Sequence, residues 1–117
     1  ETVRILEQRF AYPAEGLQAI LAHNGDLLDL PCASPFDHAL TAGESITGMV
    51  FATALILPSR QLADVKAKAV AKRLKEPRFA AKVSRERISH HDPIGIDAAT
   101  FCEIAVTEMQ AIASELE

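Results

Sequence analysis

Tryptophan is absent from this sequence, tyrosine occurs once, and cysteine occurs only twice. Cys32 and Cys102 stand far apart and form no C-x-x-C pair. Their spacing argues against a disulfide framework and against a thiolate zinc site, and it favours a reducing compartment. We therefore expect a cytoplasmic protein. The longest apolar run, Met49 to Leu57, falls far short of the roughly 20 residues that cross a bilayer, so no membrane partner is expected.

Signals for β-structure are lacking as well, since no alternating runs are joined by an Asn-Gly or Asp-Gly turn. Apolar residues recur instead at helical spacing along most of the chain. The 6 prolines and 5 glycines are spread out and do not form a linker. The sequence predicts an all-α fold, a bundle of five to seven helices in a single domain covering residues 1–117.

Local start and stop signals place the helix ends. Ser34 offers an N-cap hydroxyl before Pro35 at the first helical position, which predicts a long buried helix from Phe36 to Leu57. His23-Asn24-Gly25 is typical of a helix C-terminus, and Asp97 is expected to cap the last helix. The remaining helices are expected at Thr2–Phe10, ahead of His23, at Leu62–Leu74, at Phe79–Val83 and after Ser84.

The formal net charge is -4, but the charged residues are unevenly distributed along the chain. Between Arg60 and Arg87 lie ten of the 12 Lys and Arg residues, but only three acids. Such a basic band could attract phosphate or nucleic acid through its field, or it could be a solvated helix face balanced by acidic neighbours. A single Phe and no Tyr or Trp accompany these basic residues, so stacking platforms are lacking and nucleic acid is not an expected partner.

Glu44 is the most unusual acid of the sequence, because it stands in the middle of the most apolar helix. A buried carboxylate is costly unless it is paired, hydrogen-bonded or bound to a metal. Two interpretations follow. Glu44 is either a functional residue or the acceptor of an internal hydrogen bond from Thr41, Ser45 or Thr47.

The four histidines are the other candidates for chemistry, since the sequence has no H-E-x-x-H, no phosphate-binding glycine loop and no G-x-S-x-G. The run His90-His91-Asp92 contains a His-Asp dipeptide, but Pro93 and Gly95 follow it, which predicts an exposed polar turn. His23 is expected to interact with the negative end of its helix. His38 is expected to face solvent.

Several segments, in order, resemble small proteins of the HD superfamily whose domain variant is named from His-Asp-Ile-Gly. The similar segments are 20–24 (Ile-Leu-Ala-His-Asn), 34–40, 44–48 (Glu-Ser-Ile-Thr-Gly), 54–65, 68–75 and 79–80. The resemblance implies that the chain is the C-terminal half of a helical metal-dependent phosphohydrolase domain. The front part, with a first His and a His-Asp pair as metal ligands, would precede Glu1, where the sequence starts without Met and already in a helical pattern.

The same resemblance implies roles for individual residues. Glu44 stands where the family has an aspartate metal ligand, so it is the implied ligand of a divalent ion, Mn, Fe, Ni or Mg. His23 would lie at the metal mouth, and Arg60, Lys66 and Lys68 would contact the phosphate of the substrate, a nucleotide or another small phosphate ester. The 117-residue chain alone is expected to be inactive. Because Glu replaces Asp, a second hypothesis is a non-catalytic helical module for interaction or homo-oligomerisation.

Overall fold

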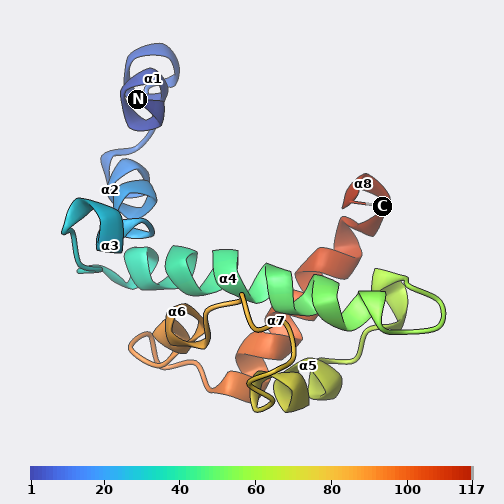
Figure 1. Cartoon of the computed structure of the whole chain (residues 1–117). Helices are drawn as coiled ribbons and strands as arrows, with labels where there is room; N and C mark the ends of the chain where they lie inside the picture. Colours follow the sequence, from blue (N-terminus) through green and yellow to red (C-terminus); the bar gives the residue numbers. More distant parts are fainter. Residues whose placement is uncertain (117) are drawn as a thin grey trace.

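The computed structural model describes residues 1–116, and within them it contains helices and connecting segments but no strand (Figure 1). The α-helices are α1 Thr2–Phe10, α2 Ala14–Ala22, α3 Gly25–Leu28, α4 Pro35–Leu55, α5 Ala67–Leu74, α6 Arg85–Ile88, α7 Ala98–Ala111 and α8 Ala113–Leu116, with 3-10 turns η1 Leu62–Asp64 and η2 Ser89–His91. The expected all-α fold is confirmed. The helix count exceeds the expected range because α3, α6 and α8 are single turns of 4 residues.

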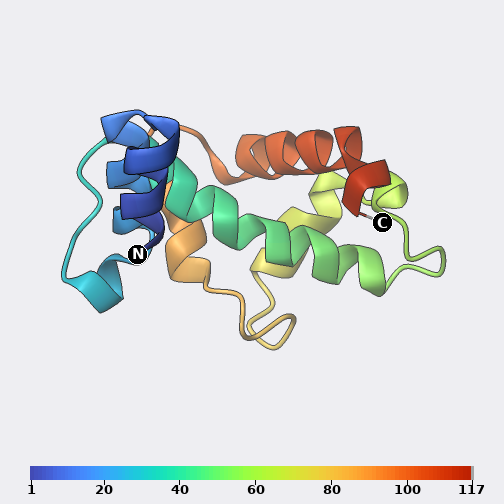
Figure 2. The same cartoon turned by 90° about the horizontal axis from the view of Figure 1, so that it is seen from above.

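The 21-residue helix α4 is the axis on which the other elements assemble. At one end it packs against α2, α6 and η2, and at the other end against α5 and α7 (Figures 1 and 2). The N-terminal helix α1 packs against α2 and buries none of its own residues. In the part of the chain that is described, no helix has both the length and the apolar composition of a membrane span.

The hydrophobic core lies where α5 and α7 cover α4. Its largest fully buried side chains include Ile46, Met49, Val50, Leu62 and Val70. On α4 the buried positions recur every three or four residues, which is the pattern of a helix that packs along one broad stripe. The N-terminal third of the molecule has fewer buried apolar residues, so the cavity described below lies at the edge of the core.

The start of α4 is fixed by a capping box. Ser34 Oγ accepts a hydrogen bond from Asp37 N at 3.1 Å, while Asp37 Oδ2 accepts from Ser34 N at 3.0 Å and from Ala33 N at 2.9 Å. The predicted N-cap at Ser34 with Pro35 behind it is therefore confirmed, as is the predicted cap at Asp97, which accepts from Thr100 N at 2.9 Å.

The segment 79–83, which was expected to be a helix, consists of turns. It is organised by Arg85, whose guanidinium donates to backbone carbonyl groups before and within these turns. The acceptors are Arg73 O at 3.3 Å, Leu74 O at 3.5 Å, Glu76 O at 2.9 Å, Ala80 O at 2.9 Å, Val83 O at 3.1 Å and Phe79 O. A guanidinium provides five donors in a rigid fork, so one side chain can satisfy carbonyl groups that a helix would have satisfied internally.

Candidate functional site

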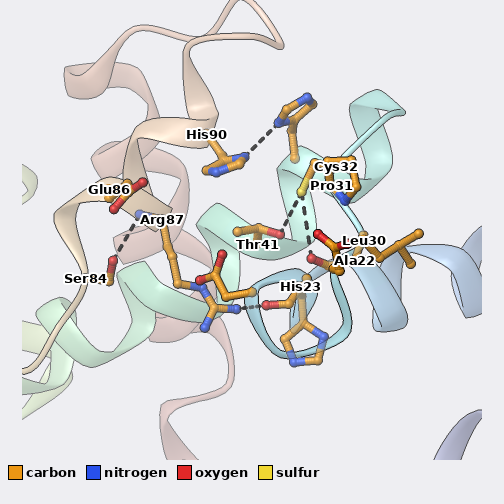
Figure 3. Close-up of a pocket in the computed structure, with 14 residues that line it drawn as sticks. Ala22, His23, Leu30, Pro31, Cys32, Thr41, Ser84, Glu86, Arg87 and His90 are labelled. Carbon is orange, nitrogen blue, oxygen red and sulfur yellow. Dashed lines mark hydrogen bonds between the residues drawn. The ribbon is translucent and has the colours of Figure 1, made fainter.

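A cavity of about 630 Å³ opens between α2, the loop that follows α3, the start of α4, and the segment formed by α6 and η2 (Figure 3). Its ionisable lining includes His23, Asp26, Asp29, His38, Arg87 and His90. These residues come from elements that are far apart in the sequence and meet only because α2 and η2 both pack on α4. The cavity therefore concentrates imidazoles, carboxylates and one guanidinium in a small volume.

His23 lies in the wall of this cavity and closes α2. Its Nδ1 is 2.5 Å from Ile20 O, and its own backbone carbonyl accepts a hydrogen bond from the Arg87 guanidinium (Figure 3). The expected position at a helix C-terminus is confirmed. The role at a substrate mouth that the resemblance implies stays a prediction; His23 is one of the residues that line the cavity.

Glu44 is exposed, with 54% of its side chain accessible, so its expected burial is wrong. The buried stripe of α4 includes Ala42 and Ile46, and a residue two positions from each points to the opposite side of a helix. Ser45 Oγ donates to Glu44 Oε2 at 3.1 Å, which is one of the internal hydrogen bonds anticipated for this acid. Its other neighbour is Arg87, whose nitrogen is 3.7 Å from the carboxylate.

The surroundings of Glu44 do not fit the metal ion that the resemblance implies. It lines a smaller cavity of about 260 Å³ that shares Ser84 and Arg87 with the larger one. Among residues 1–116, Glu44 belongs to no group of three His, Cys, Asp or Glu side chains with converging ligand atoms. The positive guanidinium beside it also opposes a second cation. Glu44 alone therefore does not form a metal site.

Arg60, Lys66 and Lys68 are exposed and lie near α5, at the other end of α4 from the cavity (Figure 1). None of the three lines either cavity. The basic residue that the structure brings to the cavity is Arg87, from the far end of the same basic band. Arg85 likewise donates its hydrogen bonds to backbone carbonyl groups of the protein. The basic band from Arg60 to Arg87 is therefore only in part a solvent-exposed helix face.

Cys32, His38 and His90 form the one group of candidate metal ligands in the described range 1–116, with ligand atoms all within 4.8 Å of one another. His38 Nδ1 and His90 Nδ1 are 2.8 Å apart, and Cys32 Sγ is 3.3 Å from Thr41 Oγ1 (Figure 3). All three ligand residues are partly buried. His38 and His90 are therefore less exposed than expected, because η2 packs directly against α4, whereas Asp92 and Pro93 of the expected turn are exposed.

Electrostatics at this end of α4 favours a neutral His90 and an ionised Asp37. Burial lowers the pKa of His90, and the nearby charges of His38 and Arg87 lower it further. Burial opposes the ionisation of Asp37, but the hydrogen bonds from Ala33 and Ser34 outweigh it, so its pKa lies below the usual value. A neutral imidazole can accept a hydrogen bond or bind a metal, which a protonated one cannot.

The sequence contained no spacing signal for the group of Cys32, His38 and His90, because its members come from a loop, a helix start and a 3-10 turn. The two cysteines are free thiols, as expected from their separation. Comparisons with protein-family models, with curated proteins and with solved structures find no match to this chain.

Proposed function

We propose that this chain forms the phosphate-binding part of an HD-type metal-dependent phosphohydrolase domain, with the larger cavity as the site for a small phosphate ester. The observation that carries the proposal is the position of Arg87. Its guanidinium lies in the cavity wall between His23 and Glu44, the two residues that the resemblance singles out. The cofactor that belongs to this proposal is a divalent ion, Mn, Fe, Ni or Mg, and the setting is the cytoplasm.

Arg87 has the chemistry that phosphate recognition needs. A guanidinium presents planar, paired N–H donors that match two phosphate oxygens, and charge-assisted hydrogen bonds of this kind are about twice as strong as neutral ones. The Arg87 side chain keeps 28% of its surface accessible, so it is held by the protein and still reaches solvent. Its ion pair with Glu44, at 3.7 Å, is long and exposed, and a phosphate could replace it at small cost.

Catalysis needs ligands that this chain does not supply at Glu44. The resemblance places a first His and a His-Asp pair ahead of Glu1, and these would carry the ion. The residues described above would contribute binding and orientation: the Arg87 guanidinium would hold the phosphate oxygens, and His23 lines the same cavity. Hydrolysis of a generic phosphomonoester by the natural protein, with and without Mn²⁺, tests the reaction itself.

The binding step is tested on this chain by calorimetric titration with inorganic phosphate and with a nucleoside monophosphate. Arg87→Gln should weaken binding at least about tenfold, because it removes a charged hydrogen-bond donor worth roughly 1.5–3 kcal/mol. Lys68→Gln removes the same charge from the exposed face of α5 and should change the affinity less than about twofold at moderate salt.

Two results would oppose the proposal. One is equal loss of phosphate affinity in Arg87→Gln and Lys68→Gln, which would indicate a diffuse field rather than a site. The other is loss only when Arg60, Lys66 and Lys68 are replaced together, which would move the phosphate to α5. Circular dichroism of each variant shows that the helices are retained.

A second candidate, the interaction or homo-oligomerisation module, is favoured by the exposed apolar side chains of the N-terminal third. Those with more than a third of their surface accessible are Ile5, Phe10, Tyr12, Leu27, Leu28 and Phe36. Such residues, when contiguous, mark surfaces that another chain covers. Sedimentation analysis separates the candidates: a stable dimer that does not bind phosphate supports the module, and a monomer that does bind it supports the hydrolase part.

A further inference from the structure

We propose that Cys32, His38 and His90 bind a zinc-type transition-metal ion, with the fourth coordination position open to the larger cavity. The proposal is independent of the phosphohydrolase assignment, because it uses none of the ligands that the resemblance implies. It stands on the convergence of one thiol and two imidazoles in the lining of the cavity.

The ligand atoms are close to the separations that a tetrahedral zinc site requires. Bond lengths near 2.05 Å for Zn–N and 2.3 Å for Zn–S put two nitrogens roughly 3.4 Å apart and a sulfur roughly 3.6 Å from each nitrogen. Here the two Nδ1 atoms are 2.8 Å apart, and no pair of ligand atoms exceeds 4.8 Å. Side-chain movements of about 1 Å would therefore complete the geometry.

A metal ion bound by both imidazoles would replace the hydrogen bond between His38 and His90. Two imidazole nitrogens at 2.8 Å must share one proton, because two lone pairs or two N–H groups facing each other repel. An ion placed between them accepts both lone pairs at once and releases that proton. The ring centroids are 5.0 Å apart with the planes tilted by 35°, and the two Nδ1 atoms face each other at 2.8 Å.

The supports of these ligands are already in place. Thr41 Oγ1, 3.3 Å from Cys32 Sγ, can donate to a thiolate, as the outer partners of metal-bound cysteines do. The capping box of Asp37 fixes both the chain immediately after Cys32 and the turn that carries His38. The third ligand, His90, lies on η2, which packs on α4. Each ligand thus comes from a segment that is held without the ion.

The donor set selects the class of metal. Thiolate with imidazole suits zinc and related borderline ions such as cobalt, nickel and copper, whereas Mg²⁺, Ca²⁺ and Mn²⁺ prefer oxygen ligands. Three protein ligands with an open fourth position are the arrangement of catalytic rather than structural zinc sites. The fourth ligand would be a water molecule or a donor atom of a molecule bound in the cavity.

Titration of the apo chain with Co²⁺ tests the proposal, because a cobalt–thiolate bond gives a charge-transfer band in the near ultraviolet that imidazole and carboxylate do not give. We expect this band at one equivalent of Co²⁺, its displacement by Zn²⁺, and a rise of about 10 °C in the unfolding temperature at a hundredfold excess of Zn²⁺ over its Kd. Cys32→Ser should abolish the band, and His90→Asn should weaken Co²⁺ binding at least about 100-fold.

The chain provides a matched control for each variant. Cys102 is a free cysteine buried in the core, and His91 is held by Ile96 O at 2.6 Å and stacks on Phe101. Cys102→Ala and His91→Asn should leave the cobalt band and the affinity unchanged. Absence of a thiolate band in the wild type would overturn the proposal, even with all variants folded. So would a band that survives Cys32→Ser and disappears in Cys102→Ala.

Discussion

Replacing Arg85 with lysine removes the guanidinium that organises the segment between α5 and α6. This side chain directs its five N–H groups to six backbone carbonyl oxygens of residues 73–83. The acceptor residues are Arg73, Leu74, Glu76, Phe79, Ala80 and Val83. Apart from the contact with Phe79, the donor–acceptor distances run from 2.9 to 3.5 Å. A lysine ammonium has three donors and no planar fork. At least half of these carbonyl groups should therefore lose their partner.

The expected loss of stability is large for a single polar substitution. A hydrogen bond from a charged donor contributes roughly 1.5–3 kcal/mol, and some of the freed carbonyl groups, being only partly buried, recover a bond to water. Losing three such bonds, in part replaced by bonds to water, should lower the free energy of unfolding by about 3 kcal/mol, a substantial part of the roughly 5–15 kcal/mol typical of a domain. The unfolding temperature should fall by about 12 °C.

Urea unfolding followed by far-ultraviolet circular dichroism measures this loss, with an unchanged dependence on urea as the sign that the native state is otherwise intact. Arg78→Lys is the control, since Arg78 lies in the same stretch and is exposed. The reasoning fails if Arg85→Lys is within about 0.5 kcal/mol of Arg78→Lys, the usual scatter of surface substitutions.

Two further predictions concern the start of α4 and its contact with η2. Ser34→Ala removes the acceptor for Asp37 N and should cost about 1 kcal/mol in urea unfolding, whereas Ser114→Ala, at an exposed position, should cost almost nothing. Burial and the charges of His38 and Arg87 hold the pKa of His90 below 6.5. Because His90 binds a proton more readily in the unfolded chain than in the folded one, the free energy of unfolding should fall as the pH drops below 6.5 toward the pKa of the folded state. Unfolding at about pH 7.5 and about pH 5.5 should show this difference in the wild type and a smaller one in His90→Asn; equal differences would contradict it.

The parts of the fold that could be predicted are those specified by residues close together in the sequence. A hydroxyl at Ser34 before Pro35, an acid at Asp97 and the His-Asn-Gly run after α2 act on backbone groups within one turn of themselves. Their effect does not depend on the rest of the chain, and the structure confirms all three. The prediction of a helix at 79–83 is wrong, because the hydrogen bonds from Arg85 stabilise a series of turns that local helix propensity does not predict.

Glu44 shows how a periodic pattern can be misjudged at one position. The sequence indicates a helix that is apolar on several sides, which predicts that an acid in its middle is buried. The buried positions at Ala42, Ile46, Met49 and Thr53 define one stripe, and Glu44 falls two residues from the first two of them. A helix rotates by about 100° per residue, so this offset places Glu44 on the opposite side, and the spacing itself contained the correct answer.

The candidate metal ligands could not be found in this way. His38 and His90 are 52 positions apart, and Cys32 precedes the helix that carries His38. The spacing of residues within one helix indicates which face of that helix each residue occupies. Whether side chains from a loop, a helix and a 3-10 turn meet depends instead on how η2 and α2 pack on α4. Neither the free Cys32 nor His90, in a run that predicts an exposed turn, stands out alone, and only the tertiary structure puts the thiol beside the imidazoles.

Both proposed sites depend on one short segment. Residues 84–91 carry Arg87 into the cavity wall and His90 into the group of metal ligands, and this segment begins at the N-cap Ser84, immediately before Arg85. Arg85 does not line the cavity, yet its hydrogen bonds fix where α6 starts. Loosening this anchor would displace the guanidinium and the imidazole together. Arg85→Lys should therefore weaken phosphate and Co²⁺ binding in the same variant, whereas Arg87→Gln should weaken phosphate binding and leave the cobalt–thiolate band in place.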